Sequence, residues 1–307
     1  MTQSRQKAVA PPVQAPADGS RRIEDAVREQ QRLLAAAAAF ESAGVEDVHR
    51  GRVAARRLRS QLKTFRPLLE PRRARLYRVD LRSFARALAG VREADVRREL
   101  LIAAASRDGS IPPADHEQLA SLLEDACIAA REALHRHHRE PGWAALLAAL
   151  ERHAAGRHLF VNHAAGLDEV LGMVAASWRK PVRLLEARPE SIADLHELRL
   201  SLKHCRYALE PVADVAPKAT ARLLRRLRDA QDCIGEHRDT VLATHWVRSN
   251  ERMLGRDFAA RLVIDLDGRA SVLRRRAATR SQKVLLAWRD WRAATRRVRK
   301  RARPGRA

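Results

Sequence analysis

Two segments of the sequence each carry a histidine followed by arginines and lysines at helical spacing. A rotation of about 100° per residue places the cations of the first segment within an arc of roughly 80°. These residues are His49, Arg52, Arg56, Arg59 and Lys63. The second segment reproduces the arc with His196, Arg199, Lys203 and Arg206. Like charges on one helix face repel one another, so these two basic stripes predict a site for an oligoanion that relieves the repulsion.

The side-chain types favour phosphate as the anionic group. The planar guanidinium of arginine matches two phosphate oxygens at a time, and lysine adds a point charge. Histidine adds a donor, and a nearby phosphate favours its protonated form. A single basic stripe is most simply interpreted as a solvated surface, which needs no ligand. The repetition of the stripe in the same phase, with histidine leading both times, favours a binding function instead.

Each basic stripe shares its helix with an apolar stripe, centred about 120° away. The apolar positions are Val48, Ala55, Leu58, Leu62 and Phe65 in the first segment, and Leu195, Leu202, Cys205, Leu209 and Val212 in the second. The two segments align without a gap over 48–62 and 195–209. A second pair of motifs follows each, with Arg92-Glu93 in the first copy and Arg238-Asp239 in the second. We therefore expect an internal duplication, with similar halves at about 22–160 and 165–295.

The fold class that we expect is all-α. Hydrophobic residues make up 46% of the chain but aromatic residues only 4%, and the dominant alanine, leucine and arginine all favour helix over strand. Gly and Pro residues, including Gly109–Pro113, Pro141 and Pro217, divide the chain into segments of ordinary helix length. We expect a disordered arm over 1–21, a helical domain over 22–295 and a disordered basic tail over 296–307.

The net charge of +23 predicts an anionic partner, such as nucleic acid, an anionic membrane surface or another polyanion. The tail from Arg296 contributes seven basic residues, so most of the excess lies elsewhere. The three cysteines, Cys127, Cys205 and Cys233, form no disulfide framework, and we expect a cytoplasmic protein. No segment approaches the roughly 18 apolar residues of a membrane-spanning helix, and we expect no membrane partner.

These motifs resemble the CHAD family, the conserved histidine α-helical domains. The resemblance rests on a doubled His-x-x-Arg-x-x-x-Arg/Lys-x-x-Arg pattern, each copy followed by Leu…Gly…Arg-Asp/Glu, and covers about 22–295. It implies two helical bundles related by a pseudo-two-fold, with a basic central cavity that binds inorganic polyphosphate. Family members often occur at polyphosphate granules, so we extend that expectation to this chain.

The resemblance also implies which residues contact the ligand. Carried over by position, they are His49, Arg52, Arg56, Arg59, Lys63, His196, Arg199, Lys203, Arg206 and Tyr207. Arg82, Arg92 and Arg228 are secondary candidates, because they could instead pair with carboxylates. The sequence departs from the family pattern at Gly51, at His204-Cys205, at Glu93 and at Arg238. None of these departures removes a residue of the basic stripes.

The main alternative is a helical module that binds nucleic acid, which the charge alone would support. The sequence has no helix-turn-helix or RRM signature and no series of aromatic residues for stacking on bases. We expect no enzyme activity, because no clustered carboxylates offer a Mg²⁺ site or a general base. We expect no cofactor, since nucleotide-binding glycine motifs are absent, and no metal, since the histidines between His135 and His163 lack ligand spacing.

Overall fold

A computed structural model describes residues 18–38, 45–155, 159–161 and 164–301. Over these residues the chain forms helices and no β-strand, with one isolated bridge between Leu69 and Phe160. The all-α prediction is confirmed. The helices are α1 (Asp18–Ala38), α2 (Val45–Thr64), η1 (Arg66–Leu68), α3 (Pro71–Ala87), α4 (Ala89–Ala105), α5 (Pro113–His138), α6 (Pro141–Ala155), α7 (Leu167–Ser177), α8 (Arg179–Glu186), α9 (Ile192–Leu209), η2 (Glu210–Val212), α10 (Pro217–Ser249), α11 (Glu251–Leu254) and α12 (Arg256–Arg301).

The helix ends follow from local chemistry. Pro71 stands in the first turn of α3, and the side chain of Glu70 accepts hydrogen bonds from the first backbone amides. Ser191 caps α9 by accepting from the amide of Asp194 at 3.1 Å. Gly255 separates α11 from α12 with a φ of 83°, a backbone conformation that favours glycine. The breaks predicted at Gly109–Pro113, Pro141 and Pro217 coincide with helix ends.

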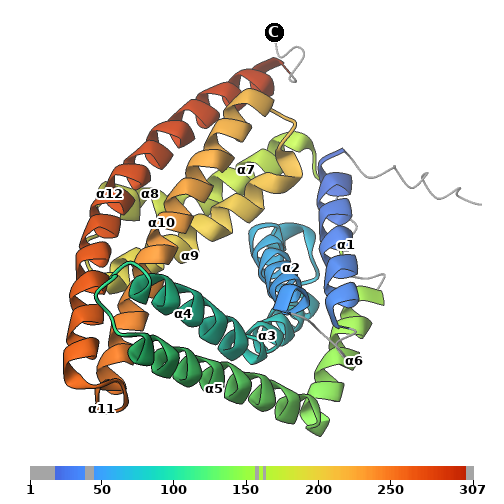
Figure 1. Ribbon diagram of the computed structural model, residues 1–307. Helices are drawn as coiled ribbons and strands as arrows, with labels where there is room; N and C mark the ends of the chain where they lie inside the picture. The colour runs from blue at the N-terminus through green and yellow to red at the C-terminus, as the bar shows by residue number, and fades with distance from the viewer. Residues whose placement is uncertain (1–17, 39–44, 156–158, 162–163, 302–307) are drawn as a thin grey trace, which may run out of the picture.

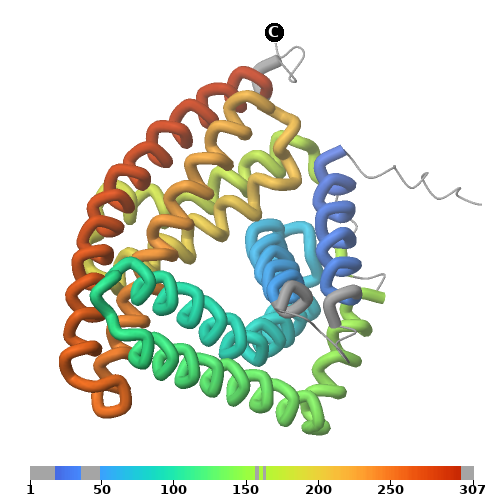
Figure 2. Tube along the Cα trace, in the orientation of Figure 1, coloured from blue at the N-terminus to red at the C-terminus, as the bar shows by residue number. Residues whose placement is uncertain are grey.

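The helices form an open frame around a crossing pair (Figures 1 and 2). The long helix α12 makes one side, with α10 packed along it. α5 makes the second side, next to α4, and α1 and α6 make the third. Inside this frame, α2 is seen nearly end-on while α9 lies across the view. α2 and α9, which carry the two basic stripes, contact each other near the middle of the molecule.

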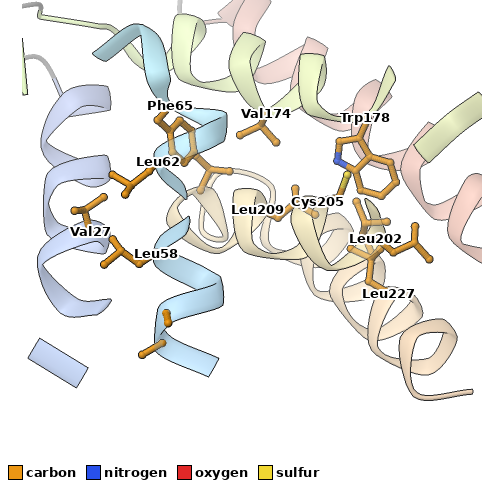
Figure 3. Packing of buried hydrophobic residues seen from close by; sticks show 14 of the residues in the cluster. Val27, Leu58, Leu62, Phe65, Val174, Trp178, Leu202, Cys205, Leu209 and Leu227 are labelled. Carbon is orange, nitrogen blue, oxygen red and sulfur yellow. The ribbon is translucent and has the colours of Figure 1, made fainter. Parts of the chain in front are cut away.

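The apolar stripes of α2 and α9 are buried as predicted, apart from Val48, whose side chain lies outside the described part of the structure. Leu58, Leu62 and Phe65 of α2 are fully buried, and Leu58 and Leu62 point toward Val27 of α1 (Figure 3). On α9 the members of the stripe are Leu195, Leu202, Cys205, Leu209 and Val212 just beyond its end, and all are buried. With these arcs packed into the core, the basic arcs of both helices face away from it.

The core does not divide at the expected boundary between the halves. The larger hydrophobic cluster extends from Ile23 on α1 to Trp291 on α12. The smaller cluster joins α4 and α5 to α10 and α12, from Leu101 to Leu266. Each cluster therefore combines residues from both sides of residue 160. Two separately packed bundles are not confirmed, and the duplication stays a prediction from the sequence.

Two helices extend beyond the expected boundaries of the helical domain. α1 begins at Asp18, inside the segment 1–21 that we expected to be disordered. α12 continues to Arg301, inside the segment expected to be a disordered tail. The boundary at residue 296 was drawn from charge. Arginine is nevertheless a good helix former, and no proline occurs between Pro217 and Pro304. The buried side chain of Thr295 shows that α12 is still packed near its end.

Replacement of a buried residue of α9 tests this packing. We expect Leu202→Ala, at a position with 0% exposure, to lower the free energy of unfolding by about 2–5 kcal/mol. Leu200→Ala is the matched control, because Leu200 lies on the same helix with 52% exposure and should change stability by about 0.5 kcal/mol or less. Denaturant unfolding measures both variants, and equal losses would contradict the assigned packing.

Candidate anion-binding site

A buried histidine connects α2 to α9 where they cross. Nδ1 of His204 lies 2.5 Å from the Ser60 hydroxyl, and its Nε2 lies 3.3 Å from the Thr64 hydroxyl. Burial, together with the charges of Lys63 and Arg78, lowers the pKa of His204 to about 4. The imidazole is therefore neutral near pH 7, with one donor and one acceptor nitrogen. Two hydroxyl groups, which can each donate or accept, satisfy both nitrogens in either tautomer.

A cavity of about 630 Å³ lies on one side of the crossing, between α2, α4, α9 and α10. We call it the α10 cavity. Eight cationic side chains line it against three carboxylates, which leaves the cavity strongly positive. The cations are Arg52, Arg56, Arg92, Arg97, Arg199, Lys203, Arg206 and Arg238. His49 lines the same cavity.

A second cavity, of about 820 Å³, lies between α2, α3, α8 and α9. We call it the α8 cavity. Nine cationic side chains line it against one carboxylate, that of Glu197, and Glu197 is ion-paired with Lys180. The cations are Arg56, Arg59, Lys63, Arg78, Arg82, Arg179, Lys180, Arg183 and Lys203. His196 lines this cavity, so the two stripe histidines lie in different cavities.

Three side chains, those of Arg56, Lys203 and Tyr207, line both cavities, so the two cavities adjoin at the crossing. Every residue of the two predicted stripes lines one cavity or both. Of the secondary candidates, Arg92 lies in the α10 cavity and Arg82 in the α8 cavity. Arg228 is exposed on α10 and lines neither.

Two equivalent arginines are held by backbone carbonyls of neighbouring helices. Arg52 donates to the carbonyls of Leu88 and Ala89 at 2.9 and 3.1 Å. Arg199 donates to the carbonyl of Gln231 at 3.3 Å. In both copies the acceptor lies in or next to the second predicted motif. The second motif therefore positions an arginine of the basic stripe in each copy. The spacing of the residues in the sequence did not indicate this role.

Gly235 brings the backbone of α10 close to Arg199. A Cβ atom at this position would lie 2.7 Å from Nη2 of Arg199, closer than real contacts allow. Burial lowers the pKa of Arg199, although Asp239 opposes the shift. Burial and the neighbouring Arg56 likewise lower the pKa of Arg52 to about 10. Both guanidinium groups stay charged at neutral pH and are fixed in place.

Lys203 has a strongly lowered pKa. Burial first, and then the cations Arg199, Arg56 and Arg206, lower its pKa to about 6, against the opposing effect of Asp239. The pKa of His196 is also lowered, by burial first and then by Arg238, Arg199 and Lys203. The site thus resists any further positive charge while no anion is bound. A bound anion would reverse these shifts by favouring the charged forms.

Several buried nitrogen atoms of the site have no hydrogen-bond partner among the described residues. They are the donors Nε of Arg56 and Nε of Arg206, and Nδ1 of His196, which donates in one tautomer and accepts in the other. The guanidinium of Arg206 lies over the ring of Tyr207, with its Cζ 4.9 Å from the ring centroid. Tyr207 is buried and so holds Arg206 at a fixed angle. Oriented donors without partners fit a ligand that supplies many acceptor oxygens.

The sequence prediction missed the contribution of α8 to the site. Arg179, Lys180 and Arg183 line the α8 cavity, and Arg78 joins them from α3. The three residues on α8 form a short basic run without an acidic residue, a signal that was present but lay outside the duplicated stripes. Arg97 and Arg238 of the α10 cavity were also not selected as ligand contacts.

No group of three or more His, Cys, Asp or Glu side chains that could hold a metal occurs in the part of the chain that the structure describes. His153 instead contacts Asp80 at 3.0 Å, and His138 stacks on Trp143. His158 and His163 lie outside the described residues. Cys127, Cys205 and Cys233 are buried free thiols. Among the described helices, none has the length and apolar character needed to cross a membrane.

Comparisons with known proteins place this architecture among known folds. The family model of the CHAD domain matches residues 22–248. PptA from Streptomyces chartreusis superposes with a TM-score of 0.69 at 20% identity, covering 90% of this chain and 100% of that one. The crystal structure of the CHAD domain from the plant Ricinus communis gives a TM-score of 0.55 at 21% identity, covering 93% and 96%. A search of curated proteins found no match.

The contact between Gly235 and Arg199 gives a test of the site. We expect Gly235→Ala to displace the Arg199 guanidinium and to weaken anion binding several-fold, because a positioned arginine donor is lost. Titration calorimetry with tripolyphosphate as an anionic probe measures the change. Gly268→Ala is the control, since a Cβ there meets nothing within 4 Å. Unchanged affinity in Gly235→Ala would show that the position of Arg199 is irrelevant to binding.

Proposed function

The chain belongs to the family of CHAD domains, and we propose that it binds inorganic polyphosphate in the α10 and α8 cavities. The observation that carries the proposal is the pair of adjoining cavities lined by cations that greatly outnumber carboxylates. A chain of phosphates supplies negative charge along its whole length, so one ligand can contact cations of both cavities. Arg56 and Lys203, which line both, would contact it at the crossing of α2 and α9.

The lining of the cavities supports an inorganic chain over a nucleic acid. Apart from histidines, the aromatic residues that line them are Tyr207 and Trp246. Each has an arginine over one face of its ring, Arg206 on Tyr207 and Arg97 at 5.7 Å from the centroid of Trp246. A nucleic acid would gain affinity from bases stacked on free aromatic faces. Polyphosphate has no bases and needs only cations and donors.

The proposal includes binding without hydrolysis. Hydrolysis of a phosphoanhydride usually relies on carboxylates that hold Mg²⁺ beside the chain. In the α8 cavity the one carboxylate, Glu197, is ion-paired with Lys180. In the α10 cavity, Asp239 contacts Arg238 at 3.4 Å.

We further propose that polyphosphate binding localises the protein to polyphosphate granules, which microscopy of a tagged protein would test.

Removal of the two cations shared by the cavities tests the proposal. We expect Arg56→Gln with Lys203→Gln to weaken polyphosphate binding at least about tenfold, because each charge-assisted hydrogen bond contributes about 1.5–3 kcal/mol. The dependence of affinity on salt should also become less steep, as fewer counterions are released. Calorimetry at two salt concentrations measures both effects. Arg72→Gln with Lys218→Gln, two exposed cations outside both cavities, is the charge-matched control.

Parallel titrations with duplex DNA distinguish the two candidate partners. Polyphosphate should bind more tightly than DNA at equal salt, and DNA should not displace it. If DNA binds as tightly and deletion of residues 296–307 removes binding of both, the protein is a nonspecific polyanion binder and the proposal is wrong. Release of orthophosphate from the chain during incubation would contradict binding without hydrolysis.

The lowered pKa of Lys203 predicts that binding takes up a proton. In the free protein this pKa is about 6, and a bound phosphate raises it by favouring the ammonium form. Affinity should therefore be highest at and below about pH 6 and fall as the pH rises toward the raised pKa of the complex. At pH 8, where histidines contribute least, calorimetry in buffers of different ionisation enthalpy should detect the uptake.

Replacement of Lys203 by methionine should remove most of this proton uptake. The matched control is Lys180→Met in the α8 cavity, where the lysine is exposed and paired with Glu197. If Lys203→Met takes up as many protons as the unmodified protein, Lys203 does not gain its charge on binding.

A further inference from the structure

A third basic depression lies away from the α2–α9 crossing, in the groove between α10 and α12. We call it the α12 groove; its volume is about 450 Å³. Its charged lining consists of Arg226 and Asp229 on α10 and of Arg275, Arg276, Arg280 and Lys283 on α12. The four cations on α12 lie outside residues 22–248, the part of the chain that matches the family model. No residue of the groove lining belongs to the α10 or α8 cavity, so the α12 groove is separate from the site described above.

The four α12 cations of the groove lack carboxylate partners among the described residues. Asp229 is its single carboxylate and contacts Arg226 at 3.6 Å. Within the described residues, Arg275, Arg276, Arg280 and Lys283 form no ion pair, although all four are exposed. Elsewhere on the same two helices, cations do find partners: Arg248 contacts Asp267 at 3.0 Å, and Arg269 contacts Glu236 at 3.9 Å. The unpaired cluster is thus a local feature of the groove.

The position of α12 in the core fixes these side chains in a row. Arg276, Arg280 and Lys283 follow one another at spacings of four and three residues, which places them on one face of the helix. Ala277, next to Arg276, and Val284, next to Lys283, are fully buried and anchor α12 to the larger core cluster. The Thr279 hydroxyl, which donates to the backbone carbonyl of Arg275 at 3.3 Å, also lines the groove. A row of cations on an anchored helix suits an extended phosphate chain.

We propose that the α12 groove is a second phosphate-binding site, which holds another segment of the same long polyphosphate chain. This inference rests on the proposed function and extends it to the outside of the frame. The groove lining contains no aromatic residue, so it offers cations and donors but no surface for stacking on bases. An inorganic chain fits that lining better than a single-stranded nucleic acid.

The α12 groove and the α10 cavity both border α10. On α10, Asp229 lines the groove and Asp232, one turn later, lines the cavity. An α-helix with its side chains is about 10–12 Å across. A long chain that leaves the cavity around α10 can therefore reach the groove, and its second contact becomes intramolecular. The gain in effective concentration predicts that long chains bind more tightly than short ones.

The test compares a groove variant with a charge-matched control. The groove variant replaces Arg275, Arg276, Arg280 and Lys283 with glutamine. The control replaces four exposed cations outside the groove and both cavities with glutamine: Lys218, Arg225, Arg252 and Arg256. Calorimetry with long-chain polyphosphate should show at least about tenfold weaker binding for the groove variant than for the control. A charge-keeping variant, with lysine at the three arginine positions, should retain most of the affinity.

Tripolyphosphate, which is too short to reach both sites, separates the two proposals. Arg56→Gln with Lys203→Gln should leave some tripolyphosphate binding, at the groove. Adding the groove substitutions to this variant should abolish the remaining binding. If the groove variant binds long chains as tightly as the control, the groove is not a second binding site. That result would leave the proposal for the two cavities unaffected. If the unmodified protein binds no polyphosphate, the proposed function itself fails. Loss of duplex DNA binding alone in the groove variant would make the groove a nucleic-acid surface and overturn the inference.

Discussion

Repulsion among the cations at the α2–α9 crossing is the constraint on which the rest of the structure depends. Left alone, these side chains would move apart into solvent. The apolar stripes on the opposite arcs prevent this, because Leu58 and Leu202 hold the two helices in one core. The neutral His204 joins α2 to α9 without adding another charge. Burial and the neighbouring cations together lower the pKa of Lys203 to about 6. Packing thus maintains a concentration of positive charge that a bound anion would relieve.

The arginines of the two stripes divide into two groups. Arg52 and Arg199 donate to backbone carbonyls, so part of their hydrogen-bonding capacity already serves the protein. Arg56 and Arg206 retain buried donors that lack partners among the described residues. The first pair fixes where positive charge lies relative to α4 and α10, and the second pair can contact a ligand directly. A stripe that is uniform in sequence is therefore not uniform in its chemistry.

The sequence predicted those parts of the structure that local periodicity determines. Helical phase separated the apolar arc of Leu58 and Leu202 from the basic arcs, and the structure confirms that separation. Phase along one helix cannot say which other helices face it. For that reason the contribution of Arg183 on α8, and the close approach of Gly235 to Arg199, were not predicted. Charge was also a poor guide to helix ends, since α12 continues through its arginine-rich end to Arg301.

The contribution of α12 to both hydrophobic clusters bears on where this domain ends. The family model stops at residue 248, before α12 begins. Yet Trp288 of α12 stacks on Trp178 with ring centroids 4.1 Å apart, and Leu262 and Leu266 belong to the smaller cluster. A fragment cut at residue 248 would expose these surfaces to solvent. The evolutionary signature and the folding unit therefore differ in extent, and only the longer one can serve as an independent module.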